Sequence, residues 1–472
     1  MLFDSKPTDS SAPTKTEIPI PQLREAVAGR VIVPGDAEYD AARTIFYGGF
    51  DRRPAAIVRV VDANDVANVI AFARDTGAEL AVRGGGHSVA GYGVSDGGIV
   101  IDLSQMKGLE IDVEGRTAWA EAGLTAVEYT KATGEHGLAT GFGDTGSVGI
   151  AGITLGGGVG YLVRKYGLTI DDLLAAEIVT ADGQILQIDA NNHPDLFWAI
   201  RGGGGNFGVV TRFKFRLHEV PQIVGGMLFL PATPETVRAY IAAAEAAPEE
   251  LSTIFAVMPA PPMPFLPAEQ HGKLIIMAFI VYAGDVEAGQ RAVEPFRAIA
   301  TPLADMVKPM PYSGMYPPEQ DYHPVAASRT MFVDSLDQRK IDVMFDRLRA
   351  GKASMNVVQI RILGGAMARV PVDATAFAHR DRKFMVNVAA LYQNPDEAAQ
   401  HEAWVTDLTA SLQAGDTAGA YVNFLGLDGE ARIREAYPGA TWDRLRAIKA
   451  QYDPTNLFRL NQNIQPSLEA NP

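Results

Sequence analysis

The sequence contains no cysteine among its 472 residues. That absence excludes disulfide bonds, thiolate nucleophiles, cysteine-ligated metal sites and iron–sulfur clusters. Long hydrophobic runs are missing too, since no stretch reaches the roughly 18 consecutive apolar residues that a membrane helix needs. Positive charge is scarce: 41 Lys and Arg against 56 Asp and Glu give a net charge of −15, which repels nucleic acid backbones and anionic lipids. We therefore expect neither nucleic acid nor a membrane as a partner.

The motifs of several large enzyme classes are also absent. There is no G-x-x-x-x-G-K-[ST] phosphate loop and no H-E-x-x-H zinc motif, and we expect no metal. GHSVA around Ser88 misses the nucleophile elbow of hydrolases because Ala90 replaces its last glycine. Gly203, Gly205 and Gly208 match G-x-G-x-x-G, but this run follows a predicted helix and opens a strand. A Rossmann fingerprint has the opposite order, so we expect no nicotinamide site.

The length favours two domains, because one hydrophobic core rarely serves so long a chain. We predict an α+β fold in which residues 22–221 and 425–472 form one domain and residues 222–424 an inserted second domain. Residues 1–21 are rich in Ser, Thr and Pro and are expected to be a flexible tail. They show no apolar segment after a basic start, so we expect no secretory signal and a cytoplasmic location. The sequence leaves the oligomeric state open.

Hydrophobic periodicity predicts the order of elements in the first domain. Strands are expected at Ala56, at 79–83, 98–103, 109–113 and 117–122, in a hairpin over 175–189 and at 209–217, and helices over 63–75, 125–136 and 193–200. The second domain is expected to pack helices over 233–247, 286–298, 338–350 and 397–412 on a sheet. The glycine-dense stretch 141–167 is expected not to form a stable helix.

The strand at 79–83 runs directly into RGGGHS, residues 83–88. Three successive glycines expose backbone N–H groups in a concave nest that suits a pyrophosphate, and His87 projects from its rim. A lone loop histidine is more often a solvated or capping residue. The motif by itself therefore leaves both interpretations open.

Four motifs that follow one another along the chain favour a functional role for His87: RGGGHS, GSVGIAGITLGGGVG, RGGGGNFGVV and DPTNLFRLNQNI. Together they resemble the berberine bridge enzyme type of FAD-linked oxidases, with a PCMH-type FAD-binding domain, within the vanillyl alcohol oxidase superfamily. The resemblance implies FAD as the cofactor, bound covalently through His87. The implied cofactor contacts are Arg83, Gly84, Gly85, Gly86, His87, Ser88, Thr145, Ser147, Val148, Gly149, Gly152, Gly157, Gly158, Val209, Tyr421, Asn423, Asn461 and Asn463.

Many relatives add a second bond to the flavin from a cysteine, and Thr145 stands at the matching position of GDTGSVG. The resemblance therefore implies a single attachment. Val148 matches a position beside the flavin where valine accompanies access of dioxygen in the family, although it could equally be a packed strand residue. An oxidase is favoured over a dehydrogenase on this ground.

Candidate catalytic residues come from the end of the second domain. Tyr421 and Asn423 lie two apart in YVNF, which reads as a strand that places both on one face. The resemblance implies that this tyrosine faces the flavin and takes the substrate proton, although a core tyrosine is the alternative. Arg369 stands where plant relatives carry a glutamate base, and could bind a substrate carboxylate or lie exposed. Tyr392 is a further catalytic candidate.

The resemblance implies an FAD-dependent oxidase that takes a hydride from a small alcohol, sugar or lactol, with dioxygen as the acceptor. Three alternatives stay open: an amine oxidase or oxidative cyclase of the same fold, a flavin dehydrogenase that does not use dioxygen, and a flavin-binding protein without catalysis.

Overall fold

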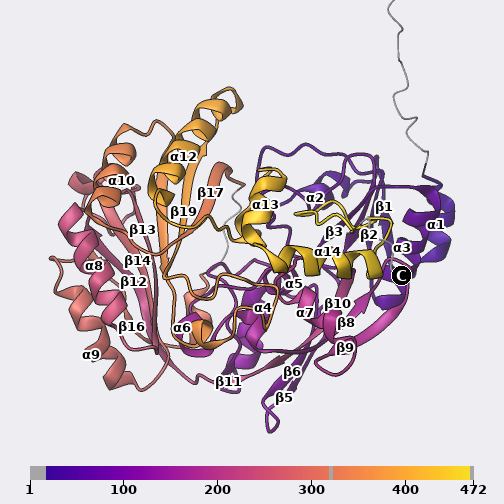
Figure 1. Ribbon diagram of the computed structural model, residues 1–472, viewed down its shortest axis with the longest axis horizontal. Helices are drawn as coiled ribbons and strands as arrows, with labels where there is room; N and C mark the ends of the chain where they lie inside the picture. Colours follow the sequence, from indigo (N-terminus) through magenta and orange to yellow (C-terminus); the bar gives the residue numbers. More distant parts are fainter. Residues whose placement is uncertain (1–17, 318–322, 468–472) are drawn as a thin grey trace, which may run out of the picture.

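The computed structural model describes residues 18–317 and 323–467. Most of the predicted tail, residues 1–17, lies outside this part, and the first helix begins at Ile20. The described chain forms three main sheets in two halves (Figure 1). None of its helices is long and apolar enough to cross a membrane.

The first sheet has the order β1-β2-β4-β3 and delivers the chain to the RGGGHS motif. β2 and β3 both pair in parallel with β4, and β1 pairs antiparallel with β2. Asp62 caps α3 by accepting a hydrogen bond from the Asp65 amide, and Gly77 ends that helix in the left-handed conformation. The elements are α1 (Ile20–Ala26), β1 (Arg30–Ile32), α2 (Tyr39–Arg43), β2 (Ala56–Arg59), α3 (Ala63–Thr76), β3 (Leu80–Arg83) and β4 (Ile99–Asp102).

The second sheet is antiparallel, with the order β5-β6-β10-β8-β9. The small strands β7 and β11 pair beside it. Its elements are β5 (Leu109–Asp112), β6 (Thr117–Glu121), α4 (Ala126–Gly134), β7 (Leu138–Ala139), α5 (Ile150–Leu155), α6 (Val163–Tyr166), η1 (Thr169–Asp171), β8 (Leu173–Val179), β9 (Ile185–Asp189), α7 (Pro194–Ile200), β10 (Val209–Arg216) and β11 (His218–Glu219).

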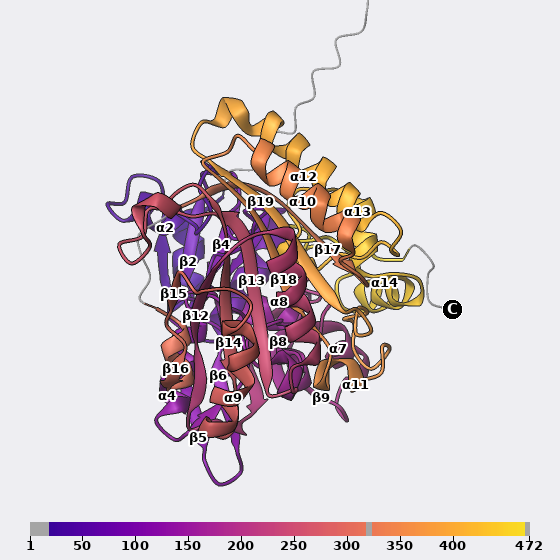
Figure 2. The same ribbon diagram turned by 90° about the vertical axis from the view of Figure 1, so that its left-hand side faces the viewer.

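The third sheet, called here the large sheet, holds eight antiparallel strands in the order β15-β12-β14-β13-β18-β19-β17, with β16 paired to β12. Helices α8, α9, α10 and α12 cover its outer face (Figures 1 and 2), and its other face is turned toward the first half. Its elements are β12 (Ile223–Pro231), α8 (Pro234–Ala246), β13 (Leu251–Pro259), η2 (Ala268–Gln270), β14 (Leu274–Tyr282), α9 (Val286–Arg297), β15 (Ala304–Asp305), β16 (Lys308–Met310), η3 (Tyr312–Met315), β17 (Val325–Val333), α10 (Gln338–Ala350), β18 (Met355–Ile362), α11 (Ala366–Arg369), β19 (Phe384–Tyr392), η4 (Pro395–Glu397) and α12 (Ala398–Gln413).

The last segment returns to the first half through η5 (Val422–Phe424), α13 (Glu430–Ala436) and α14 (Ala440–Tyr452). A fully buried lysine links this last segment to the first half through hydrogen bonds. Lys449 Nζ donates to Asp453 Oδ2 at 2.6 Å, to the Asn206 carbonyl at 2.7 Å and to the Phe458 carbonyl at 2.9 Å. A buried ammonium needs such partners to remain charged, so this lysine ties α14 to the loop that precedes β10.

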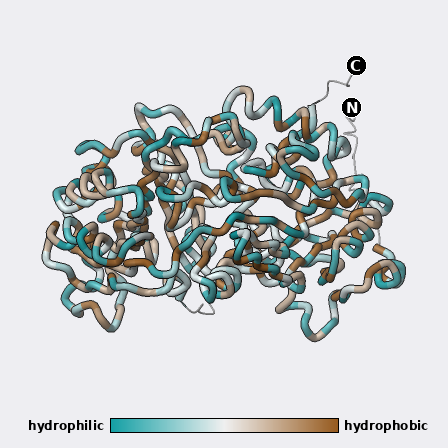
Figure 3. Tube along the Cα trace, turned by 90° about the horizontal axis from the view of Figure 1, so that it is seen from below, coloured by the Kyte–Doolittle hydropathy of each residue, from teal (hydrophilic) through white to brown (hydrophobic). Residues whose placement is uncertain are grey.

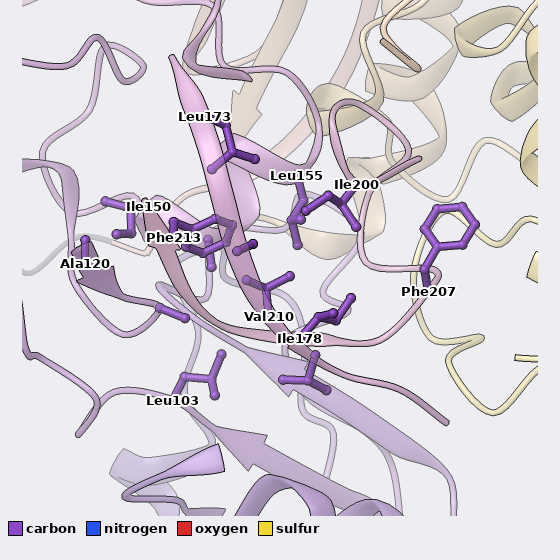
Figure 4. Packing of buried hydrophobic residues seen from close by; sticks show 14 of the residues in the cluster. Leu103, Ala120, Ile150, Leu155, Leu173, Ile178, Ile200, Phe207, Val210 and Phe213 are labelled. Atoms are coloured by element: carbon purple, nitrogen blue, oxygen red, sulfur yellow. The ribbon is translucent and has the colours of Figure 1, made fainter. Parts of the chain in front are cut away.

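Hydrophobic residues are concentrated in the interior of both halves, and hydrophilic residues lie mostly at the periphery (Figure 3). One cluster joins the first two sheets to the carboxyl-terminal helices, and Figure 4 shows part of it, where Phe213 and Val210 of β10 pack near Leu155 and Ile200. A second cluster fills the space between the large sheet and its helices. At about 25 cal/mol per Å² of apolar surface, such burial is the main term that stabilises each half.

The α+β prediction is confirmed. The G-x-G-x-x-G run does lie between α7 and β10, in the order opposite to a Rossmann site. The predicted boundary at Pro221 falls between β11 and β12. The expectation of no helix in the stretch 141–167 is wrong, because α5 and α6 form there. Most glycines of this stretch lie between or beside the two short helices. Inside a helix they would destabilise it.

Candidate functional site

A cavity of about 490 Å³ lies between the first half and the large sheet. Three glycine-rich segments line it from one side, and we call residues 83–88, 143–152 and 203–208 the glycine loops. Strands β17, β18 and β19 supply the opposite wall, and residues 421–425 and 458–462 close it. The predicted cofactor residues that line the cavity are Arg83, Gly84, Gly85, Gly86, His87, Ser88, Thr145, Val148, Gly149, Gly152, Val209, Tyr421, Asn423 and Asn461.

The glycine loops approach one another as bare backbone. A Cβ on Gly85 would lie 2.2 Å from the amide nitrogen of Gly149, so neither loop could carry a side chain there without moving apart. Gly152 and Gly205 also line the cavity, but a Cβ on either would meet nothing within 4 Å. This open space beside exposed backbone fits the close approach of a dinucleotide.

His87 is held in one orientation by two neighbours. Its Nε2 lies 2.9 Å from Ser147 Oγ, and its ring stacks on Phe46 with the centroids 4.0 Å apart. Burial lowers the pKa of His87 to about 4, although the Asp144 carboxylate acts in the opposite direction. The imidazole is therefore neutral at pH 7. Within the described residues Nδ1 has no hydrogen-bond partner.

Other predicted residues around His87 either line the cavity or hold neighbouring residues in place through hydrogen bonds. Arg83 Nη2 donates to Asp102 Oδ2 at 2.7 Å, and both side chains are buried. Ser88 Oγ accepts a hydrogen bond from the Tyr92 amide at 3.3 Å. Thr145 lines the cavity with its hydroxyl 3.4 Å from Asp144 Oδ1. Ser147 acts on the site through its contact with His87.

Tyr421 and Asn423 meet, although not by the route the sequence predicts. Tyr421 directly precedes the short 3₁₀ helix η5, and Asn423 lies within it. The prediction of a strand is therefore wrong. Asn423 Nδ2 donates to Tyr421 Oη at 2.9 Å, and the Gly158 amide donates to the same oxygen at 3.0 Å. Asn423 Nδ2 also donates to the Ile153 carbonyl at 3.1 Å, which joins the Tyr421–Asn423 pair to helix α5.

Tyr421 is buried, and burial raises the pKa of its hydroxyl. Hydrogen bonds from Asn423 and from the Gly158 amide act in the opposite direction, as does the nearby guanidinium of Arg361. Two donors already point at the oxygen, so the tyrosine's own proton is the one left to face the cavity. Gly157 does not line the cavity and contributes through the backbone before Gly158.

Of the two predicted carboxyl-terminal asparagines, Asn461 lines the cavity and Asn463 does not. Asn461 Nδ2 donates to the Gly205 carbonyl at 3.0 Å and to the Phe458 carbonyl at 2.9 Å. Its buried Oδ1 has no partner among the described residues, and the same holds for Oδ1 of Asn463, which is not on the cavity wall. Unpaired buried amide oxygens are costly, and Asn461 leaves one beside the loops that fit a cofactor.

Two predicted catalytic residues lie elsewhere. Tyr392 ends β19 with its ring against His401, on the face of the large sheet that the helices cover. The alternation of side chains along a strand explains this, because its neighbour Leu391 is the residue that faces the cavity. Arg369 sits in the short helix α11, is exposed, and pairs with Glu249 at 2.6 Å. We therefore assign a catalytic role to neither.

Sequence reasoning missed several polar residues of the cavity wall, among them Asp144, Gln359, Arg361 and Asn387. Arg361 Nη2 donates to Asp144 Oδ2 at 2.5 Å, and Nη1 donates to Gln359 Oε1 at 2.6 Å. Gln359 and Asn387 are directly opposite on β18 and β19. One signal could have found the three strand residues Gln359, Arg361 and Asn387, since polar side chains interrupt the apolar strands VVQIRI and FMVNVAAL on a single face.

No group of three or more His, Cys, Asp or Glu side chains that could hold a metal ion occurs in the part of the chain that the structure describes.

Two family models match the sequence. A model of an FAD binding domain matches residues 54–189, and a model named berberine and berberine like matches residues 420–465. The first range carries two of the three glycine loops, and the second carries Tyr421, Asn423 and the carboxyl-terminal asparagines.

Full-length similarity extends beyond these segments. The sequence is 32% identical to the uncharacterized FAD-linked oxidoreductase YvdP of Bacillus subtilis, over 93% of this chain and 99% of that protein. It is 29% identical to (R)-6-hydroxynicotine oxidase of Paenarthrobacter nicotinovorans, over 93% of this chain and 97% of the relative. A solved xylooligosaccharide oxidase from Myceliophthora thermophila C1, in complex with xylobiose, superposes with a TM-score of 0.82 at 25% identity, covering 95% and 99% of the two chains.

Proposed function

Because the chain belongs to the berberine bridge enzyme-like family of FAD-linked oxidoreductases, we propose that it binds FAD through one covalent bond from His87 and oxidises a hydroxyl group of a small molecule, with dioxygen as acceptor. The observation that carries this proposal is the placement of His87 and Tyr421 on one cavity, with the glycine loops as its floor. His87 would hold the cofactor, and Tyr421 would face the reacting end of the substrate.

The surroundings of His87 support attachment through Nδ1. A neutral imidazole is a competent nucleophile, and the lowered pKa of His87, about 4, keeps the ring neutral across the physiological range. Ser147 engages Nε2, which leaves the lone pair on Nδ1 when Nε2 carries the proton. The Phe46 ring limits rotation of the imidazole. Thr145 cannot form a thioether, so the attachment would be single.

Attachment is tested without any substrate. We expect denatured, acid-precipitated protein to stay yellow and to give a fluorescent band on a denaturing gel, and His87→Ala to release all flavin. Free flavin in the supernatant of the wild-type protein would contradict the covalent bond. A control variant, His271→Ala, removes a histidine that does not line the cavity and should stay fluorescent.

Bound FAD supplies a hydride acceptor for the substrate carbon and, once reduced, passes the electrons to dioxygen. The protein's part is to orient the substrate and to handle one proton. Tyr421 Oη is fixed by Gly158 and Asn423, so its O–H can bind the substrate oxygen. As a phenolate, stabilised by the same two donors, it can accept the hydroxyl proton while the hydride leaves. If Tyr421 stays protonated, the alternative is a hydride transfer that needs little help from a base.

Val148 supports dioxygen as the acceptor, because it lines the cavity rather than the core of a strand. A small side chain at this place leaves room for a diatomic molecule. The test is rapid reoxidation of the reduced protein by air with formation of hydrogen peroxide. Slow reoxidation in air, with fast reoxidation by a dye, would favour the dehydrogenase alternative.

Substrate class is tested by anaerobic bleaching of the flavin against a panel of alcohols, sugars and amines. We expect alcohols or sugars to bleach it. Bleaching by amines alone would favour an amine oxidase. Failure of every compound to reduce the flavin would favour a flavin-binding protein without catalysis.

A further inference from the structure

Arg361 and Asp144 form an ion pair that crosses the cavity from one wall to the other. Arg361 stands on β18 of the large sheet, and Asp144 precedes Thr145 in the second glycine loop. Their Nη2 and Oδ2 atoms are 2.5 Å apart, and the arginine side chain is only 2% exposed. The guanidinium also lies 4.9 Å from the centre of the Phe424 ring. Each charge is thus matched by the other.

The charges that line the cavity cancel among the described residues. Arg83, Asp144 and Arg361 are the ionised side chains on its wall. Arg83 is matched by Asp102 behind it, and His87 is neutral because its pKa is low. At the large-sheet end, where a substrate would lie, only the Asp144–Arg361 pair is charged, and its two members compensate each other.

The rest of that wall is uncharged, and it combines apolar side chains with a few polar ones. Gln359 accepts a hydrogen bond from Arg361, Asn387 stands opposite Gln359, and Ser328 lies on the neighbouring strand. Amide and hydroxyl groups recognise neutral hydroxyl groups by hydrogen bonding. An ammonium or carboxylate group would instead lose its hydration and find its natural counter-charge already engaged.

We propose that the Asp144–Arg361 pair determines substrate specificity, by keeping the substrate end of the cavity electrically neutral and so selecting uncharged hydroxyl compounds over cationic amines and carboxylates. This inference rests on the proposed oxidation of a hydroxyl group and specifies the charge of its substrate. Removal of either partner leaves an uncompensated charge of known sign in the cavity. Removal of the carboxylate should then favour binding of anions, and removal of the guanidinium should favour binding of cations.

The test uses three probes of similar size: benzyl alcohol, benzoate and benzylammonium. Their binding to the flavin-loaded protein is measured at pH 7 and fixed ionic strength from the perturbation of flavin absorbance. We expect wild-type protein to bind neither ion more tightly than the alcohol. Asp144→Asn should raise the affinity for benzoate at least tenfold relative to benzyl alcohol, and Arg361→Gln should do the same for benzylammonium.

Two further variants guard against trivial explanations. The double variant Asp144→Asn with Arg361→Gln is neutral again and should return to the wild-type order, which also provides a result if one single variant fails to fold. Asp171→Asn removes a carboxylate from a matched buried pair with Arg380, 2.7 Å apart and outside the cavity. It should change stability without changing the order of the probes. Fluorescence on a denaturing gel verifies that each variant carries flavin.

Unchanged probe order in both single variants would overturn the proposal. So would the absence of any spectral change when benzoate is added to Asp144→Asn, because an uncompensated Arg361 would then not present its charge to the cavity. The proposed function fails by a different result, namely flavin that no alcohol or sugar reduces. The two failures are therefore distinguishable.

Discussion

The glycine loops on one side of the cavity present mainly backbone, whereas strands β17, β18 and β19 on the other side present side chains. In the glycine loops a single added carbon collides with backbone, as at Gly85 and Gly149. On the strands one position can change without altering the path of the chain, because alternate residues point into the cavity from a fixed ladder. The loops are therefore suited to one ligand, and the strands to substrates that differ between relatives.

The sharpest test of that contrast is Gly85→Ala. Its Cβ would lie 2.2 Å from the Gly149 nitrogen and 2.8 Å from its Cα, so the two loops must separate. We expect bound flavin to fall by at least about tenfold, since a backbone clash is among the severe classes of mutation. The ratio of flavin to protein absorbance measures it. Gly134→Ala, where a Cβ meets nothing within 4 Å, should keep its flavin; equal flavin content in both variants would break the contrast.

Tyr421→Phe should leave flavin content intact and slow anaerobic flavin reduction by about 10² or more, the usual contribution of a positioned acid or base. Substrate affinity should change far less. Because burial raises the pKa of Tyr421, the phenolate forms only in alkaline solution, and the wild-type rate should climb as pH increases toward 10. A rate independent of pH, and unaltered in the phenylalanine variant, would assign the proton to water.

Attachment of the flavin should tolerate acid. With the pKa of His87 at about 4, the neutral imidazole predominates at pH 5, whereas a histidine of ordinary pKa near 6.5 would react about thirtyfold more slowly there. Apoprotein from riboflavin-starved cells, mixed with FAD between pH 4.5 and 7.5, should gain fluorescent label at a nearly constant rate. A steep decline below pH 6.5 would show that the ring titrates normally.

Asn387→Ala should weaken substrate binding and leave flavin binding unchanged. Loss of one hydrogen-bonding side chain costs about 1 kcal/mol, so the apparent Kd for substrate should increase roughly tenfold or less with flavin content unchanged. Tyr392→Phe, on the opposite face of the same strand, serves as the matched control and should leave Kd as it is. Lost flavin in the asparagine variant would show that this wall also supports the cofactor.

The smallest effect is expected for Arg369→Ala. Its partner Glu249 is also solvent-exposed, with side-chain exposures of 61% and 46%, and such exposed pairs contribute little to stability. Flavin reduction should be unaltered, and the thermal unfolding midpoint should move little. A substantial fall in the reduction rate would return this arginine to the list of catalytic candidates.

The glycine loops can be located from the sequence because residue type and order within one short segment are enough to recognise them, and residues of all three segments line the cavity. RGGGHS comes directly after the apolar run of β3, and its histidine is the fifth residue of the motif. The Asp144–Arg361 pair joins residues 217 positions apart, and no local pattern specifies which distant strand faces a given loop. Tyr392 shows the same limit, since a shift of one residue along β19 separates the cavity face from the helix face. The turn at Tyr421 was misread because β-prone residues also occupy short 3₁₀ turns.

The fastening of α14 by Lys449 implies an order of events during synthesis. Residues 421–425 and 458–462 complete a cavity whose first wall is encoded before residue 90. A ribosome makes residues 83–88 well before residues 458–462, so the cavity is incomplete until the latter have emerged. Yellow colour in this protein would therefore report a chain that extends at least through residue 462, and truncation anywhere before α14 should give colourless product.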